Sequence, residues 1–380
     1  MRPDIDFTAL AAPGVRGLEA YVPGMPMVEL QRRYGLTDVI KLASNENPLG
    51  PPAASVEALR AALTAFGRYP DGAAYALKAG LATHLAVEPD RITVGNGSNE
   101  LLCLLAETFL TPGDEAVCSE FGFVVYRLAV QATGATLRVA PANAAAAAVQ
   151  PLGHDLGALA AAVNDRTRLV FVANPNNPTG TWLPPQDLGR FVASLPSRVI
   201  VVLDEAYLEY MPAGARPDSL AWLRSLPNLV ICRTFSKMYG LAGLRVGYAV
   251  SHPGLAALLE RVRQPFNVNE AAQVAALAAL GAHEHVQRSR FVNESGLRQL
   301  RDGLTDFGWR VPPSAGNFVL ADTGGPAAPW NEALLRKGII VRPVANYGLP
   351  HHLRITVGLP AENARLLAAL AAQRNGSQPP

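Results

Sequence analysis

The chain has 380 residues, 49% of them hydrophobic and 17% charged, which is enough for one large domain and a smaller one. Its formal net charge is only +2, with both signs mixed along the chain, so no basic surface for nucleic acid or an acidic membrane is indicated. The three cysteines lack CxxC spacing, and the seven histidines lack the spacing of metal ligands. We therefore expect a cytoplasmic protein with reduced cysteines and without a metal site, a nucleic-acid partner or a membrane anchor.

The chain divides into four predicted parts. Residues 1–30 are expected to form an extended N-terminal arm, because prolines and glycines interrupt them repeatedly. A large domain is predicted from residues 49–270, and a smaller α+β domain from residues 31–48 together with residues 271–372. Residues 373–380 are predicted to be a frayed tail.

The predicted large domain alternates short apolar strands with helices. Its strands are apolar on both faces, which is typical of a mostly parallel sheet flanked by helices, so the fold class is α/β. The expected strands are residues 91–94, 115–118, 136–140, 169–173, 199–203, 229–232 and 246–250. The expected helices are residues 99–110, 124–132, 158–163 and 186–195. Ligands of such sheets bind at the carboxyl ends of the strands.

After residue 269 the pattern changes to longer helices rich in alanine and leucine. The expected helices are residues 271–280, 283–307 and 361–372, and the expected strands are residues 318–321, 339–342 and 353–357. This alternation favours a compact second domain. The run of alanines at residues 144–148 is interpreted as a surface helix or loop.

The first chemical motif is residues 94–100, Val-Gly-Asn-Gly-Ser-Asn-Glu, where a strand leads through glycines into a helix. Free backbone N–H groups at such a helix start point toward a phosphate, aided by the helix dipole. The groups in question belong to Gly97, Ser98 and Asn99. The GxGxxG spacing of dinucleotide sites is absent, which disfavours a nicotinamide cofactor.

Two further signals follow strand ends. Phe121 could stack on a planar cofactor, with Phe123 and Tyr126 as alternatives for that role. Residues 174–180, Asn-Pro-Asn-Asn-Pro-Thr-Gly, are predicted to form a rigid turn. From this turn, Asn177 could donate its amide to a ring hydroxyl.

A carboxylate follows the predicted strand at residues 199–203. Burying Asp204 there is costly unless a cation or a donor faces it, and a protonated pyridine nitrogen is such a donor. Tyr207 is placed to hydrogen-bond the phenolic oxygen of the same ring. An aspartate that caps a helix is the alternative interpretation.

Residues 230–245 are the most informative stretch. An apolar strand leads into Lys237, and a lysine at a buried strand end can lose its proton through desolvation and attack a carbonyl. Thr234 and Arg245 supply a hydroxyl and a planar cation for a phosphate. A solvated lysine is the alternative for this stretch alone. Taken with the other motifs, it predicts a pyridoxal phosphate site.

The order and wording of these motifs resemble the aspartate-aminotransferase-like (fold type I) pyridoxal phosphate enzymes. Within that superfamily the chain is similar to the histidinol-phosphate aminotransferase family, through residues 19–24, 41–50, 68–71 and 353–358. The resemblance spans nearly the whole chain, and its motifs are more specific for the cofactor than for the substrate. One departure concerns the stacking residue, because residues 119–121 read Ser-Glu-Phe where the family often has Pro-Thr-Tyr.

The resemblance implies a role for each matching residue. Lys237 would bond covalently to the cofactor and then carry a proton, and Asp204 would pair with the ring nitrogen. Asn177 and Tyr207 would contact the ring oxygen. The phosphate ligands would be Ser98, Asn99, Thr234 and Arg245.

The resemblance also implies how substrates and a second subunit take part. Arg354 would bind the α-carboxylate of the amino-acid partner through its two N–H groups. Tyr21 and Arg342 would recognise the histidinol-phosphate side. Tyr69 would reach the cofactor of the neighbouring subunit, which implies an obligate homodimer with shared active sites.

The implied activity is transamination between histidinol phosphate and 2-oxoglutarate, giving imidazole acetol phosphate and glutamate in histidine biosynthesis. Its two half-reactions predict ping-pong kinetics. Three alternatives stay open. They are an aromatic amino-acid aminotransferase of the same family, a pyridoxal phosphate-dependent lyase or decarboxylase, and a non-catalytic cofactor-binding regulator.

Overall fold

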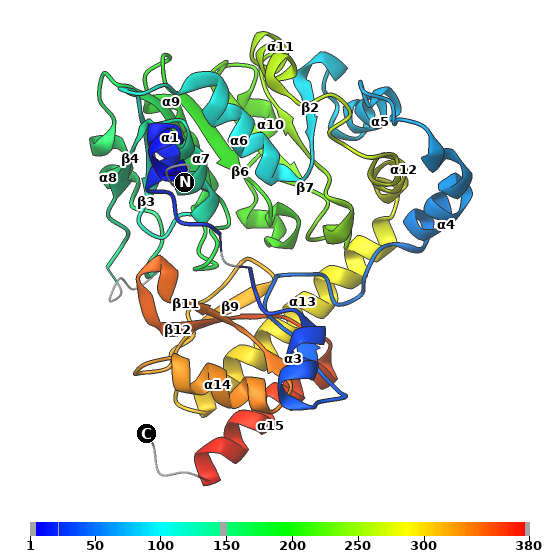
Figure 1. Cartoon of the computed structure of the whole chain (residues 1–380), viewed down its shortest axis with the longest axis vertical. Helices are drawn as coiled ribbons and strands as arrows, with labels where there is room; N and C mark the ends of the chain where they lie inside the picture. Colours follow the sequence, from blue (N-terminus) through cyan, green and yellow to red (C-terminus); the bar gives the residue numbers. More distant parts are fainter. Residues whose placement is uncertain (1–4, 22, 145–149, 377–380) are drawn as a thin grey trace.

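The computed structural model describes residues 5–21, 23–144 and 150–376, and its main feature is a seven-stranded sheet in the upper part of Figure 1. The strand order is β2-β8-β7-β6-β5-β3-β4. Neighbouring strands are parallel except at β8, which runs antiparallel to both β7 and β2. The strands are β2 (Ile92–Gly95), β3 (Glu115–Ser119), β4 (Thr136–Ala140), β5 (Thr167–Ala173), β6 (Ile200–Asp204), β7 (Leu229–Thr234) and β8 (Gly247–Val250). The predicted α/β class with a mostly parallel sheet is confirmed.

The strands send alternate side chains into two apolar layers. In β6, Val202 lies in the layer shared with α6, α7 and α11, whereas Val201 and Leu203 lie in the layer shared with α5, α9 and α12. Helices on both faces explain why these strands read as unbroken apolar runs. The helices of this part are α4 (Ala53–Ala62), α5 (Tyr75–Leu85), α6 (Ser98–Phe109), α7 (Val124–Ala132), α8 (Leu156–Ala162), α9 (Pro185–Ser194), α10 (Ser219–Trp222), α11 (Pro253–Val262) and α12 (Glu270–Ala279).

A smaller body lies below the large sheet in Figure 1. Its antiparallel sheet has the order β11-β12-β9, and a short parallel pair joins β1 to β10. Its strands are β1 (Ile40–Lys41), β9 (Phe318–Asp322), β10 (Ile339–Ile340), β11 (Arg342–Val344) and β12 (Leu349–Thr356). Its helices are α3 (Met27–Tyr34), α13 (His283–Asp306), α14 (Ala328–Arg336) and α15 (Pro360–Gly376). The β1–β10 pair supports our proposal that residues 31–48 belong with residues 271–372.

The N-terminal arm differs locally from its prediction as an extended segment. It contains two short helices, α1 (Phe7–Leu10) and α2 (Pro13–Arg16), of which α1 is capped by the Asp6 side chain. The predicted end of the arm at residue 30 falls inside α3, which begins at Met27. Helix α2 packs on α7, and a Cβ atom at Gly14 would lie 2.3 Å from the Gln131 carbonyl oxygen. The glycine that suggested an extended chain therefore serves a close helix contact.

Other differences are small. The strand predicted at residues 339–342 is divided into β10 and β11. Most of the alanine run at residues 144–148 and the last four residues of the predicted tail lie outside the described residues. Within the described ranges, no helix has both the length and the hydropathy needed to cross a bilayer.

Candidate active site

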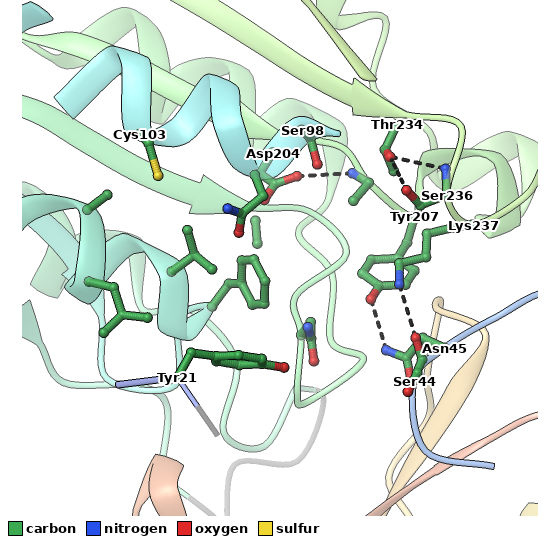
Figure 2. A pocket seen from close by; sticks show the side chains of 18 of the residues that line it. Tyr21, Ser44, Asn45, Ser98, Cys103, Asp204, Tyr207, Thr234, Ser236 and Lys237 are labelled. Carbon is green, nitrogen blue, oxygen red and sulfur yellow. Dashed lines mark hydrogen bonds between the residues drawn. The ribbon is translucent and has the colours of Figure 1, made fainter. Parts of the chain in front are cut away.

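A cavity of about 490 Å³ opens at the carboxyl ends of β5, β6 and β7, and both bodies contribute to its walls. Figure 2 shows side chains converging on it from segments that are far apart in the sequence. The predicted site residues that line it are Tyr21, Ser98, Asn99, Asn177, Asp204, Tyr207, Thr234, Lys237, Arg245, Arg342 and Arg354. The folded chain thus brings most of the predicted set to one place.

Lys237 extends from the loop after β7 into this cavity. Its Nζ atom donates to the Ser44 carbonyl oxygen at 3.2 Å and lies 5.7 Å from the centre of the Tyr207 ring. Burial, with a smaller contribution from the positive charge of Arg354, lowers the pKa of Lys237 to about 7. A substantial fraction of this amine is therefore neutral near pH 7 and can act as a nucleophile.

Asp204 is the last residue of β6 and is 5% exposed. Its carboxylate accepts two hydrogen bonds, from the Tyr126 hydroxyl at 2.8 Å and from the Ala206 N–H at 3.2 Å. Burial raises the pKa of Asp204 to about 6, and the Tyr126 bond opposes that rise. A protonated ring nitrogen in the cavity would offset the cost of this buried charge.

An anion-binding part of the cavity, which we call the phosphate end, is lined by Ser98, Asn99, Thr234, Ser236 and Arg245. Gly97 directly precedes Ser98 in the chain and is not among the lining residues. Ser236 Oγ accepts from Thr234 Oγ1 at 2.9 Å and from Arg245 Nη1 at 3.2 Å. Gly97 caps α6 with a φ of 77°, and a Cβ atom there would lie 2.2 Å from Arg245 Nη2. Three hydroxyls, a guanidinium and a helix N-terminus thus meet where an anion would be stabilised.

A second part of the cavity wall, which we call the carboxylate end, is built around Arg354 of β12. Arg354 Nη1 donates to Asn177 Oδ1 at 2.6 Å, and Nη2 donates to the Ala43 carbonyl oxygen at 2.7 Å. Arg354 is 8% exposed, and its Nε has no hydrogen-bond partner within the described part of the chain. No carboxylate of the described residues forms an ion pair with it. A buried cation without an anionic partner suits an incoming carboxylate.

Tyr207 also belongs to the carboxylate end. Its hydroxyl accepts a hydrogen bond from Asn45 Nδ2 at 2.9 Å, and its ring packs edge-on against Phe318. Burial raises the pKa of Tyr207 to about 12, so the phenol keeps its proton at neutral pH. It can therefore donate that proton to a negative oxygen.

The two candidate stacking residues, Phe121 and Phe123, lie in different surroundings. Phe121 packs in an apolar cluster with Leu320, Val344 and Leu349, and it is not among the residues of the cavity wall. Phe123, two positions later, does line the cavity. Both aromatic residues lie in the turn between β3 and α7, where no strand periodicity dictates which of them points inward. Phe121 stays the predicted stacking residue, and the place of Phe123 in the cavity wall favours Phe123 as the alternative.

Three predicted residues lie at the edge of the site or outside it. Tyr21 lines the cavity entrance with Arg342, whose guanidinium carbon is 5.9 Å from the centre of the Tyr21 ring. Tyr69 is 83% exposed and stacks on Phe266, with 4.7 Å between ring centres, away from the cavity wall. The single chain therefore leaves Tyr69 available to another molecule.

Several residues at the site had no predicted role. Ser44, Asn45 and Ser236 line the cavity. Tyr126, an alternative for the stacking residue, instead donates to the Asp204 carboxylate. Ser236 directly precedes Lys237, and Asn45 lies within the segment 41–50. Their position inside recognised motifs is the signal that could have identified them as site residues.

The expected cofactor fits this arrangement by its chemistry. Pyridoxal phosphate carries an anion for the phosphate end, an aldehyde for the Lys237 amine and a ring nitrogen for Asp204. Gly97 leaves open the space that any side chain would take from Arg245. Each polar group of the cofactor thus has a matching side chain.

Comparison with known proteins gives a consistent picture. The family described as aminotransferase class I and II matches residues 37–370. Histidinol-phosphate aminotransferase 2 of Pseudomonas fluorescens is 53% identical over 368 residues, covering 96% of this chain and 98% of that protein. The corresponding protein of Pseudomonas aeruginosa is 52% identical over 367 residues, covering 96% and 98%. The crystal structure of histidinol-phosphate aminotransferase from Sinorhizobium meliloti in complex with pyridoxal-5′-phosphate has a TM-score of 0.86 at 31% identity, covering 97% of this chain and 98% of that one.

Proposed function

The chain belongs to the aminotransferase class I and II family, and from that premise we propose that it is a pyridoxal phosphate-dependent aminotransferase of histidine biosynthesis. The proposed reaction exchanges an amino group between histidinol phosphate and 2-oxoglutarate, giving imidazole acetol phosphate and glutamate. Relatives that share about half of their residues with this chain and carry the name histidinol-phosphate aminotransferase support the choice of substrate.

One observation carries the proposal. An amine with a pKa of about 7, a buried carboxylate and a buried guanidinium face one cavity, although they come from three different segments. The guanidinium has no anionic partner among the residues that the structure describes. The three groups belong to Lys237, Asp204 and Arg354. Together they supply a nucleophile, a partner for a ring N–H and a receptor for a substrate carboxylate.

Proton transfer is the proposed task of Lys237. When bound, pyridoxal phosphate supplies an aldehyde that bonds to amines and a protonated ring that withdraws electrons from the substrate's Cα. The neutral amine of Lys237 can then accept the Cα proton of the substrate and deliver a proton to the C4′ carbon of the cofactor. Its bond to the Ser44 carbonyl holds the amine at the border between the two ends of the cavity.

The other side chains orient the reacting groups. Asp204, fixed by Tyr126 and the Ala206 N–H, holds the proton on the ring nitrogen. Tyr207 and Asn177 face the ring oxygen, and the phosphate end anchors the opposite side. Arg354 binds the α-carboxylate of glutamate and 2-oxoglutarate, and the bound carboxylate excludes water from the buried guanidinium.

Recognition of histidinol phosphate and imidazole acetol phosphate, which carry a phosphate and no carboxylate, is assigned to Arg342 and Tyr21 of the cavity wall. Arg342 and Tyr21 lie together there, so a cation and an aromatic face are available to a phosphate and an imidazole ring. Phe123 supplies the alternative aromatic face for the cofactor ring.

A homodimer with shared active sites and a cytoplasmic location are also part of the proposal. Tyr69 and Phe266 form an exposed aromatic pair, 83% and 44% exposed, which would be covered if Tyr69 entered the site of a second subunit. Free cysteines among the described residues, Cys103, Cys118 and Cys232, agree with a reducing compartment.

The test is covalent and spectroscopic. The purified protein is incubated with pyridoxal phosphate, reduced with borohydride and digested, and the modified peptide should contain Lys237. Glutamate should then convert the visible spectrum of the unreduced protein, and histidinol phosphate should be a better amino donor than phenylalanine. A protein that stays colourless would refute the cofactor. A preference for phenylalanine with phenylpyruvate would instead select the aromatic aminotransferase, and absence of conversion by glutamate would point to a lyase.

A further inference from the structure

Residues 43–45 contact three side chains of the proposed site in succession. The Ala43 carbonyl accepts from Arg354 at 2.7 Å, and the Ser44 carbonyl accepts from Lys237 at 3.2 Å. The next residue, Asn45, donates from Nδ2 to the Tyr207 hydroxyl at 2.9 Å (Figure 2). Of these contacts, the Asn45 contact is made by a side chain, so a substitution can change it without altering the backbone.

Asn45 is held firmly on its far side. The Thr356 hydroxyl accepts from the Asn45 N–H at 2.9 Å and donates to Asn45 Oδ1 at 3.0 Å. Asn317 Nδ2 donates to the Asn45 carbonyl at 3.0 Å. Asn45 is 1% exposed and Thr356 is 3% exposed. The φ of Asn45 is 55°, in the left-handed region that asparagine tolerates better than most residues.

The direction of these bonds determines the direction of the Tyr207 proton. Thr356 uses its oxygen to accept the Asn45 N–H, so its own proton goes to Asn45 Oδ1. The amide then presents N–H, and not its oxygen, to Tyr207. A phenol oxygen that accepts from an amide must point its own hydrogen elsewhere. Because Tyr207 lines the cavity, that hydrogen is available to a ligand there.

We propose that Asn45 is a positioning residue for the proposed reaction, which orients the Tyr207 hydroxyl so that its proton is donated into the cavity, toward the ring oxygen of the cofactor. This inference rests on the proposed function of the cavity. Thr356 stands two residues after Arg354 on β12, so the strand that carries the carboxylate-binding guanidinium also sets the Asn45 amide.

Asn45→Asp tests the proposal by reversing one hydrogen bond. An ionised carboxylate only accepts, so it takes the Tyr207 proton away from the cavity. The measurement is the visible absorbance of the bound cofactor as a function of pH, in wild type, Asn45→Asp, Tyr207→Phe and the double variant. A hydrogen-bond donor stabilises negative charge on the ring oxygen of the cofactor. That charge is larger after the Lys237 nitrogen that is joined to the cofactor has lost its proton. Loss of the donor should therefore raise the pH at the midpoint of the absorbance change by about one pH unit in either single variant.

The double variant decides between orientation and a simple charge effect. If Asn45 acts through Tyr207, the double variant shifts no further than Tyr207→Phe alone. Additive shifts, or an unchanged midpoint in Asn45→Asp, would overturn the inference. Wild type that binds no cofactor or lacks turnover would instead overturn the proposed function, so the two failures are distinguishable.

A second variant and a matched control keep the test decisive. Asn45→Gly suits the positive φ and deletes the amide without adding charge, so it should raise the midpoint in the same direction by less, and not at all when Tyr207 is Phe. It carries the test if Asn45→Asp does not fold. Asn363→Asp places the same change at another fully buried asparagine, bonded to Gln299 and Gly358 away from the cavity, and its midpoint should equal that of wild type.

Discussion

The two ends of the cavity are built in different ways. The phosphate end comes from turns at the ends of neighbouring strands, β2, β7 and β8, within one sheet. The carboxylate end joins both bodies, through the contact of Arg354 in the smaller body with Asn177 in the larger one, 177 positions apart. We infer that the first end is as rigid as the sheet, whereas the second depends on how the two bodies sit against each other. Substitutions at the first should change cofactor affinity, and substitutions at the second should change catalysis and substrate affinity.

Lys237→Ala should have the largest effect, because Lys237 serves both ends. We expect turnover to fall about thousandfold or more, since the nucleophile and the proton carrier are lost together. The phosphate end should still retain the cofactor. Steady-state kinetics measure the loss of turnover, and equilibrium binding of pyridoxal phosphate measures whether the cofactor is retained. Turnover within tenfold of wild type would contradict the assignment of Lys237.

Arg354→Lys tests the carboxylate end. A lysine keeps the charge but loses the two parallel N–H groups, so the KM for glutamate should rise by about thirtyfold to a hundredfold, the equivalent of about 2 to 3 kcal/mol. Cofactor affinity should stay unchanged. Arg365→Lys, which alters a surface arginine paired with Asp38, is the matched control and should leave both quantities at wild-type values.

Arg245→Ala tests the phosphate end, where we expect cofactor affinity to change and substrate affinity to stay the same. Loss of a charge-assisted hydrogen bond should weaken pyridoxal phosphate binding by about tenfold to a hundredfold. At saturating cofactor the KM for glutamate should equal that of wild type. A raised KM with normal cofactor affinity would break the distinction between the two ends.

Tyr126→Phe should give the smallest effect, seen in the pH dependence of cofactor binding. Asp204 has a pKa of about 6 because burial disfavours its charge, and the Tyr126 bond lowers that pKa. Binding to the cofactor-free protein should therefore weaken as the pH falls through about 6, when the carboxylate becomes protonated and cannot pair with the ring N–H. Without the Tyr126 hydroxyl, this weakening should occur about one pH unit higher. Titration of cofactor affinity from pH 5 to 8 measures the shift, and an unchanged profile would contradict it.

The difference between the two ends of the cavity also explains which parts of the molecule could be predicted from the sequence. The large sheet was predictable because strands such as β6 alternate side chains between two apolar layers and so read as unbroken apolar runs. The phosphate end was predictable because its residues lie in contiguous motifs around Gly97 and Lys237. Local chemistry and local sequence coincide in both cases.

The carboxylate end was predicted less completely. Arg354 came from family resemblance, whereas the contact of Asn45 with Tyr207 joins residues 162 positions apart and leaves no trace in local spacing. Phe121 and Phe123 could not be separated either, because they lie in an irregular turn and tertiary packing alone turns Phe123 toward the cavity. Short helices α1 and α2 were missed since their prolines and glycines favour a loop.

The single reversed strand of the large sheet has a consequence for the chemistry. Two neighbouring parallel strands are joined by a crossover of a dozen or more residues, which returns the chain to the opposite end of the strands. Because β8 runs antiparallel to β7, the chain between Thr234 and Gly247 never leaves the edge where β7 ends. One short excursion thereby delivers both the amine at position 237 and the guanidinium at position 245, so a change in its length would displace nucleophile and anchor at the same time.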